Sequence, residues 1–199
     1  FKYRNPAMIL SDGVIGQMME KVVLPPIKPR RTEEQIRKEC PWATIGRTMD
    51  REPNILTSLE LKPEVMEARN LHMQEKYKLC KENEVRYEAQ KCDDADYIIV
   101  SFGSAARIGE KAVELAREQG IKAGLFRPIT LWPFPSKQIA EIAKGKKGIL
   151  VSEINAGQMI QDVRLAINGA LPVEHFGRLG GIVPEPEEIV NALKEKLMK

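Results

Sequence analysis

The sequence predicts an α/β protein whose C-terminal part is a doubly wound, mostly parallel sheet. From residue 95 onward, short apolar runs rich in β-branched residues alternate with stretches whose apolar residues recur at helical spacing. A strand followed by a helix returns the chain in the same direction through a right-handed crossover, so repeats of this unit give parallel strands. Polar or Pro/Gly-rich segments separate each strand from the next helix, which is typical of such units.

Four strands and four helices are expected in this part. Gly120 and Gly145 close two of the helices, because glycine readily adopts the left-handed conformation that ends many helices. The first helix carries Ile108, Ala112 and Leu115 on one face. The expected strands are 97–102, 123–127, 148–152 and 173–176, and the expected helices are 107–119, 136–144, 157–168 and 185–198.

The loops that follow these strands are the candidate functional region. If the strands are parallel, the loops 102–104, 127–135, 153–158 and 177–181 lie along one edge of the sheet, where open α/β sheets usually meet a ligand or a partner. The residues in these loops that we expect to contact a partner subunit or a ligand are Ser104, Arg127, Trp132, Asn155, Gln158, Arg178, Gly180 and Gly181.

Two interpretations of these loops remain open from the residues alone. Ser104 fits a helix N-cap, and the amides beyond it could also hold a phosphate or a carboxylate. The polar groups of Glu153, Asn155, Gln158 and Arg178 could bind an anion or a protein carbonyl, or could tie the loops to one another. The same holds for Gly180 and Gly181, which suit either a close backbone approach or a simple turn.

The chain divides into three segments, two of which precede the α/β domain. Residues 1–24 contain an expected strand at 7–11 and a helix at 12–21, and we interpret them as the tail of a preceding α/β domain. Residues 25–94 form an irregular, proline-rich connector, part of which (28–39) could also be a mobile linker, and then a long helix from Pro63 to about residue 90. This helix carries a narrow apolar stripe made of Met66, Met73, Tyr77, Cys80 and Tyr87. That stripe favours packing onto another domain or subunit. Residues 95–199 form the α/β domain.

The composition excludes several classes of function. With 31 basic and 28 acidic residues the net charge is only +3, which gives no case for nucleic-acid binding. No apolar run approaches the roughly 20 residues of a membrane span. The three cysteines are far apart and cannot frame a zinc site or an iron–sulfur cluster, so we expect reduced thiols in a cytoplasmic protein. Neither His72 nor His175 has a nucleophile motif nearby, so no catalytic residue is assigned.

The sequence also resembles a known family. Four segments closely resemble the C-terminal part of the α subunit of 2-oxoacid:ferredoxin oxidoreductases, and most closely the branched-chain, 2-ketoisovalerate type: Tyr3–Gly13, Asn83–Glu88, Gly124–Pro135 and Asn155–Met159. The resemblance covers nearly the whole chain, and the string from Arg127 to Pro135 is its most specific part.

This resemblance implies a fold like the transketolase C-terminal domain, with residues 1–24 as the tail of a pyrimidine-binding domain. It implies a thiamine-diphosphate enzyme that decarboxylates a 2-oxoacid oxidatively, delivers the acyl group to coenzyme A and passes electrons to ferredoxin. Thiamine diphosphate, Mg²⁺ and the iron–sulfur clusters then belong to other subunits or domains. Ser11-Asp12-Gly13 is similar to the start of the magnesium and diphosphate motif, but the asparagine pair that must follow is missing. We therefore reject a metal site here and interpret Asp12 as the cap of a helix.

The expected role is therefore that of an oxidoreductase subunit which contributes to assembly and is inactive alone. Its expected partners are the thiamine-diphosphate-binding β subunit and iron–sulfur subunits, with ferredoxin and coenzyme A at the level of the complex, and neither nucleic acid nor membrane. Two alternatives remain. One is a stand-alone α/β module that binds a ligand or a partner, and the other is a transketolase or dehydrogenase E1 component.

Overall fold

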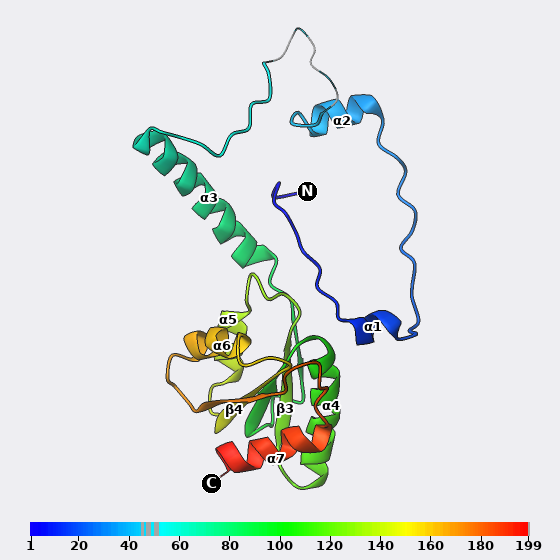
Figure 1. The fold of residues 1–199 in the computed structure, drawn as a ribbon, viewed down its shortest axis with the longest axis vertical. Coiled ribbons are helices and arrows are strands. Elements are labelled where there is room, and N and C mark those ends of the chain that lie inside the picture. The colour runs from blue at the N-terminus through cyan, green and yellow to red at the C-terminus, as the bar shows by residue number, and fades with distance from the viewer. Residues whose placement is uncertain (45, 47–48, 50–51, 199) are drawn as a thin grey trace. The chain divides into compact units, whose positions relative to one another are not determined.

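The computed structural model describes residues 1–44, 46, 49 and 52–198 (Figure 1). These residues form two compact units. The first combines Phe1–Met18 with Gln74–Lys199, and the second is Met19–Met73. The division of the chain at residues 24 and 94 that the sequence suggests remains a prediction.

The first unit contains a five-stranded sheet. Its strands are β1 (Tyr87–Gln90), β2 (Tyr97–Val100), β3 (Ala123–Pro128), β4 (Gly148–Glu153) and β5 (Val173–Gly177). Their order in the sheet is β1-β3-β2-β4-β5. Strands β2 to β5 are parallel to their neighbours, whereas β1 pairs with β3 in the antiparallel direction. The prediction of a mostly parallel sheet is therefore confirmed.

Helices cover both faces of this sheet, as a doubly wound fold requires (Figure 1). They are α4 (Gly103–Glu118), α5 (Ser136–Ile142), α6 (Met159–Ile167) and α7 (Pro186–Leu197). Side chains alternate along a strand, so Ile98 and Ile99 of β2 enter different cores although both are fully buried. The face of Ile98 packs on α5 and α6, and the face of Ile99 packs on α4 and α7.

The sequence predicts a long helix from Pro63 to about residue 90, and the last part of this prediction is wrong. Helix α3 (Pro63–Asn83) ends seven residues earlier, and Tyr87–Gln90 becomes the edge strand β1. Tyr87 therefore leaves the predicted apolar stripe and stacks on Phe126 of β3, with ring centroids 5.3 Å apart. Backbone pairing with β3 and this ring contact outweigh the helical spacing of a mostly polar segment.

The first residues also differ from the prediction. The expected buried strand at 7–11 is wrong, because no strand forms there and Met8, Ile9 and Leu10 expose 82%, 96% and 75% of their surface. The helix expected at 12–21 is only α1 (Gly13–Gln17), although its predicted cap is confirmed: Asp12 Oδ1 accepts the N–H of Ile15 at 2.8 Å. An extended apolar segment without a sheet edge beside it has nothing to bury it.

The second unit contains one helix that the sequence analysis missed. Helix α2 (Glu33–Glu39) lies in the charged stretch that we expected to be irregular. Thr32 and Gln35 form a reciprocal capping box, in which each side chain binds the other residue's backbone N–H. A threonine followed three residues later by glutamine is a helix-start signal, and it could have identified this helix.

Among the described residues, each helix is too short or too polar to span a lipid bilayer.

Candidate functional site

The four strand-end loops lie on one side of the sheet, because β2, β3, β4 and β5 run in the same direction. We call the side formed by residues 102–104, 127–135, 153–158 and 177–181 the carboxyl edge. The chain leaves β2 toward β3 and leaves β4 toward β5, so neighbouring strands β2 and β4 send their loops in opposite directions. Ligands of open α/β sheets bind at such a reversal.

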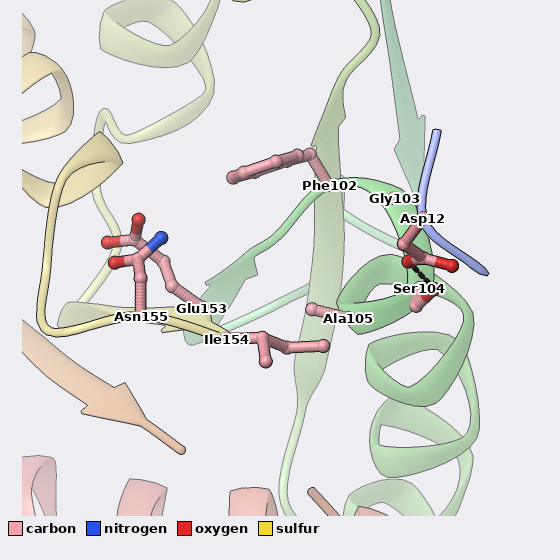
Figure 2. Close-up of a pocket in the computed structure, with 8 residues that line it drawn as sticks. All are labelled: Asp12, Phe102, Gly103, Ser104, Ala105, Glu153, Ile154 and Asn155. Atoms are coloured by element: carbon pink, nitrogen blue, oxygen red, sulfur yellow. Dashed lines mark hydrogen bonds between the residues drawn. The ribbon is translucent and has the colours of Figure 1, made fainter. Parts of the chain in front are cut away.

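A small crevice of about 150 Å³ lies at this reversal (Figure 2). The start of α4 forms one side of it and the end of β4 forms the other, with Asp12 from the N-terminal segment beside α4. We call it the edge crevice. Its lining residues are Asp12, Phe102, Gly103, Ser104, Ala105, Glu153, Ile154 and Asn155.

Ser104 joins the N-terminal segment to the carboxyl edge. Its hydroxyl donates a hydrogen bond to the Asp12 carboxylate, as the dashed line in Figure 2 indicates. The backbone N–H of Ile15 and then this hydroxyl lower the pKa of Asp12 below its ordinary value. The N-cap role considered for Ser104 is wrong, because α4 begins at Gly103 and its N-cap is Phe102.

Glu153 is the most constrained polar group of the region. It is fully buried, and its two carboxylate oxygens accept the backbone N–H groups of Gln158, Met159 and Ile160 at 3.2, 2.8 and 3.1 Å. These N–H groups open α6, where no intrahelical acceptor exists for them. A negative charge at this point is also stabilised by the helix dipole. Glu153 therefore fastens the end of β4 to the start of α6.

Asn155 and Gln158 belong to the same arrangement. The side-chain oxygen of Asn155 accepts the N–H groups of Gly157 at 2.7 Å and Gln158 at 3.2 Å, so it holds the turn that leads into α6. Gln158 takes part through its backbone N–H, and its side chain is exposed. Of the two interpretations of this loop, the contacts favour the one in which its polar groups tie the backbone together.

His175 lies beneath this loop, on β5. Its Nε2 is buried 3.7 Å from Glu153 Oε1 and makes no hydrogen bond within the described chain. Burial lowers the pKa of His175 below its ordinary value of 6.5; the Glu153 carboxylate opposes this shift, while Lys196 and Arg164 add to it. The histidine is therefore neutral at pH 7.

This lowered pKa predicts a pH dependence of stability. Below pH 6.5 the unfolded chain binds a proton at His175 more readily than the folded chain does, so the folded state loses stability as the pH falls from 7 toward 5. We expect His175→Gln to flatten this part of the curve of unfolding free energy against pH, measured by urea denaturation. His72→Gln, at an exposed position on α3, should leave the curve unchanged, and an equal flattening by both variants would contradict the assignment.

The remaining predicted residues of the carboxyl edge divide between internal contacts and the surface. Arg178 Nη1 pairs with Glu188 Oε1 at 2.9 Å and so joins the loop after β5 to α7. Gly180 and Gly181 have positive φ angles of 66° and 84° with open space around them, so they serve a turn rather than a close approach. Arg127 Nη1 pairs with Glu88 Oε2 at 3.0 Å across β3 and β1.

Trp132 lies apart from the edge crevice, on the loop after β3. It meets the ring of Tyr77 edge to face, with centroids 5.6 Å apart. Together with Asn5 and Lys81 these rings line an open groove of about 360 Å³, which we call the tryptophan groove. The structure thus brings Ser104, Asn155 and Glu153 together at the edge crevice and places Trp132 in a separate site.

Sequence reasoning missed the residues that fix the N-terminal segment. Glu84 Oε1 accepts hydrogen bonds from the Tyr3 hydroxyl at 2.7 Å and from Lys2 Nζ at 3.1 Å. The bond from Tyr3, and then that from Lys2, lowers the pKa of Glu84. These residues are more than 80 positions apart, so no local pattern could reveal the contact.

Comparisons with known proteins identify the C-terminal part of the chain. Residues 95–189 match the family model of the pyruvate:ferredoxin oxidoreductase core domain II. Residues 95–189 are thus similar to that core domain. The resemblance to 2-oxoacid:ferredoxin oxidoreductases that the sequence indicates is thereby confirmed.

Curated relatives agree with this match. The chain is 41% identical to the ketoisovalerate oxidoreductase subunit VorB of Methanothermobacter marburgensis, over 98% of this chain and 53% of that protein. It is 30% identical to the 2-oxoglutarate synthase subunit KorA of the same organism, over 96% of this chain and 56% of that protein. The chain thus spans about half the length of the curated relatives it matches.

A solved structure shares the fold of most of this chain. The 2-oxoglutarate:ferredoxin oxidoreductase from Magnetococcus marinus superposes with a TM-score of 0.61 at 24% sequence identity. The match covers 69% of this chain and 24% of that one. It supports the same arrangement of strands and helices and says nothing about substrate.

The described residues do not fit the metal groups that the resemblance implies. No group of three or more His, Cys, Asp or Glu side chains within the described chain could hold a metal ion. Cys40, Cys80 and Cys92 are free and buried, and burial is the main cause that raises the pKa of the Cys92 thiol. A thiol held protonated is a poor metal ligand, so we derive no step through a cluster or a metal here.

Proposed function

We propose that this chain is part of the α subunit of a thiamine-diphosphate-dependent 2-oxoacid:ferredoxin oxidoreductase, and that its α/β domain acts mainly in assembly of the enzyme. The observation that carries the proposal is the 41% identity to the ketoisovalerate oxidoreductase subunit over 98% of the chain. The reaction is the oxidative decarboxylation of a 2-oxoacid to an acyl-coenzyme A, with electrons passed to ferredoxin. Identity to the 2-oxoglutarate synthase subunit is only 30%, which favours a branched-chain 2-oxoacid as substrate.

The contacts of the carboxyl edge support a role in assembly. Glu153 and Asn155 use their oxygens to hold the start of α6, and Arg178 pairs with Glu188. Side chains that already make these hydrogen bonds and ion pairs within the chain are poor candidates for proton transfer to a substrate, because those contacts would have to break first. They give instead a rigid surface made of short, well-connected loops, and rigid surfaces bind partners at a low entropic cost.

The cofactors are proposed to lie in other subunits or domains. Thiamine diphosphate with Mg²⁺ would supply the decarboxylation chemistry there, and iron–sulfur clusters would supply the electron transfer. This chain contributes a face of the assembly, with the thiamine-diphosphate-binding β subunit and iron–sulfur subunits as partners and ferredoxin and coenzyme A as substrates of the complex. Three free, buried thiols fit the reducing conditions of a cytoplasm.

Purification of the native complex through a tag on this chain tests the proposal. We expect companion subunits that contain iron–sulfur clusters and thiamine diphosphate, identified by native mass spectrometry. We also expect coenzyme-A-dependent reduction of ferredoxin with 3-methyl-2-oxobutanoate that exceeds the rates with 2-oxoglutarate and pyruvate. A monomer without companions would contradict the subunit role, and a small molecule bound at the edge crevice would favour a stand-alone binding module. A higher rate with 2-oxoglutarate would contradict the substrate only.

A further inference from the structure

The residues that line the tryptophan groove come from three segments that are far apart in the sequence. Tyr77 and Lys81 are one turn apart on α3, and Trp132 comes from the loop after β3. Asn5 completes the lining from the N-terminal segment, which is held nearby by the bond between Tyr3 and Glu84. The groove is thus built by three segments that tertiary contacts bring together.

The loop that carries Trp132 is firmly held at both ends. The N–H groups of Ile129 and Thr130 donate to the carbonyl oxygen of Arg86 at 2.9 and 3.1 Å, and the Thr130 hydroxyl accepts the N–H of Arg86 at 2.9 Å. On the other side Phe134 packs against the core beneath α5 and α6. A loop fixed in this way presents its side chains in one arrangement, which lowers the entropic cost of binding.

The side chains that this fixed loop presents are apolar. Trp132 exposes 54% of its surface, and Ile129 and Leu131 on the same loop expose 48% and 39%. Tryptophan and tyrosine are the residues most enriched among the energetic centres of protein interfaces. An exposed apolar patch on an ordered loop is costly in water, so a binding role explains it better than a structural one.

Positive charge borders these rings. Lys81 lines the groove, and Lys76 Nζ lies 6.0 Å from the centroid of the Tyr77 ring. Nearby basic side chains such as Lys2 and Arg127 are paired with carboxylates, whereas no carboxylate of the described chain pairs with Lys76 or Lys81. Lys81 in the groove and Lys76 beside the Tyr77 ring therefore offer two uncompensated ammonium groups next to an apolar surface.

We propose that the tryptophan groove binds an acidic segment of a partner subunit, which packs an apolar side chain against Trp132 and places carboxylates next to Lys76 and Lys81. The groove is too open for a small molecule, since sites for small ligands enclose most of the ligand surface. Charge complementarity selects an acidic partner over a basic one and speeds its association. The identity of the partner as a subunit rests on the proposed function.

Cross-linking of the native complex tests where the groove lies in the assembly. A carbodiimide joins an amine directly to a carboxylate without a spacer, so we expect mass spectrometry to find Lys76 or Lys81 linked to an aspartate or glutamate of another polypeptide. We also expect both amines to be acetylated more slowly in the complex than in the isolated chain. Equal acetylation together with the absence of such links would overturn the proposal.

Variants then test the chemistry of the occupant. We expect Trp132→Ala, and separately the double variant Lys76→Glu with Lys81→Glu, to weaken binding of the partner by about tenfold or more. The loss in the lysine variant should shrink at high salt. Lys122→Glu is the matched control, because Lys122 is exposed before β3 at the opposite edge of the sheet, and it should change affinity less than about twofold.

The possible results separate the two proposals. A complex of the expected composition with unchanged affinity in both variants would overturn the groove and leave the subunit role intact. Loss of affinity that equals that of Lys122→Glu would also overturn it, since net charge alone would then explain the effect. A chain without any partner would overturn both proposals. Circular dichroism of each variant should match that of the parent, because Trp132, Lys76 and Lys81 lie outside the two cores.

Discussion

Replacement of Glu153 by glutamine is expected to destabilise the protein by about 2–4 kcal/mol, the range for a buried group that loses charge-assisted hydrogen bonds. The carboxylate accepts three backbone N–H groups at the start of α6, and both oxygens are used. Glutamine offers one acceptor oxygen, and its NH₂ group would face N–H donors. At least one donor of a fully buried site would therefore lose its partner.

Thermal unfolding of Glu153→Gln measures this loss, and a fall in Tm of about 4–16 °C corresponds to it for a chain of this size. Glu141→Gln is the matched control. Glu141 of α5 pairs with Lys144, which follows the helix, and both side chains are about 70% exposed. Exposed pairs of this kind contribute little to stability. If the two variants had the same Tm, Glu153 would not be the cap that its distances indicate.

The sequence predicts the parallel part of the sheet well because the information there is local. Each strand of the βα units is a short apolar run, and each helix carries its own apolar face. Gly120, with a φ angle of 78°, follows the C-cap of α4 as the sequence predicts. Helix α5 ends at Ile142, two residues before its predicted end, so Gly145 lies beyond its C-cap, Ala143. The direction of β2 to β5, and with it the carboxyl edge, follows from the handedness of the crossovers.

Local patterns fail where a contact between distant segments decides the structure. Tyr87 has suitable spacing for a helix, but pairing of Tyr87–Gln90 with β3 makes the segment a strand. Ala7–Ser11 has the composition of a buried strand, yet a strand needs a sheet edge beside it. Helix α2 is a different case, because the signal from Thr32 and Gln35 was present in the sequence.

The candidate site shows the same limit at the level of single residues. The sequence places Ser104, Asn155 and Glu153 at one edge, and the edge crevice confirms that they lie together. The sequence does not reveal that the Glu153 carboxylate accepts backbone N–H groups at the start of α6. Nor does it reveal the hydrogen bond from Ser104 to Asp12. Whether a polar side chain is free or committed depends on partners in space, and here the committed groups favour a surface for assembly over a ligand site.

Replacement of Gly177 by alanine is the second change with a large expected effect. A Cβ atom at this position would collide with the backbone oxygen of Asn155 and would lie 2.6 Å from Cε1 of His175. Backbone lies on one side of this Cβ and a packed ring on the other, so the methyl group cannot avoid the collision by a small shift of either neighbour. We expect a destabilisation of about 1–3 kcal/mol, as is common when a methyl group is forced into a packed region.

Because Gly177 lies beside Glu153, we expect the disturbance to reach the start of α6 and not the rest of the sheet. Gly177 is the register partner of Glu153, and the next N–H, of Arg178, donates to the carbonyl oxygen of Glu153 at 3.3 Å. A displaced β5 would therefore loosen the residue that caps α6. Hydrogen exchange should become faster at the amides of Met159 and Ile160 and stay unchanged in α4, whose contacts do not involve this turn.

Gly16→Ala separates this steric effect from the general cost of changing a glycine. Gly16 lies in α1 without a positive φ angle, and a methyl group added there would have nothing within 4 Å, so alanine should be neutral or slightly stabilising. Unfolding by urea compares the two variants. Because the collision at Gly177 involves the loop that Glu153 and Asn155 hold, a stable Gly177→Ala protein with normal exchange at α6 would mean that this loop moves freely, and the carboxyl edge would then not be the rigid surface on which the proposed role in assembly depends.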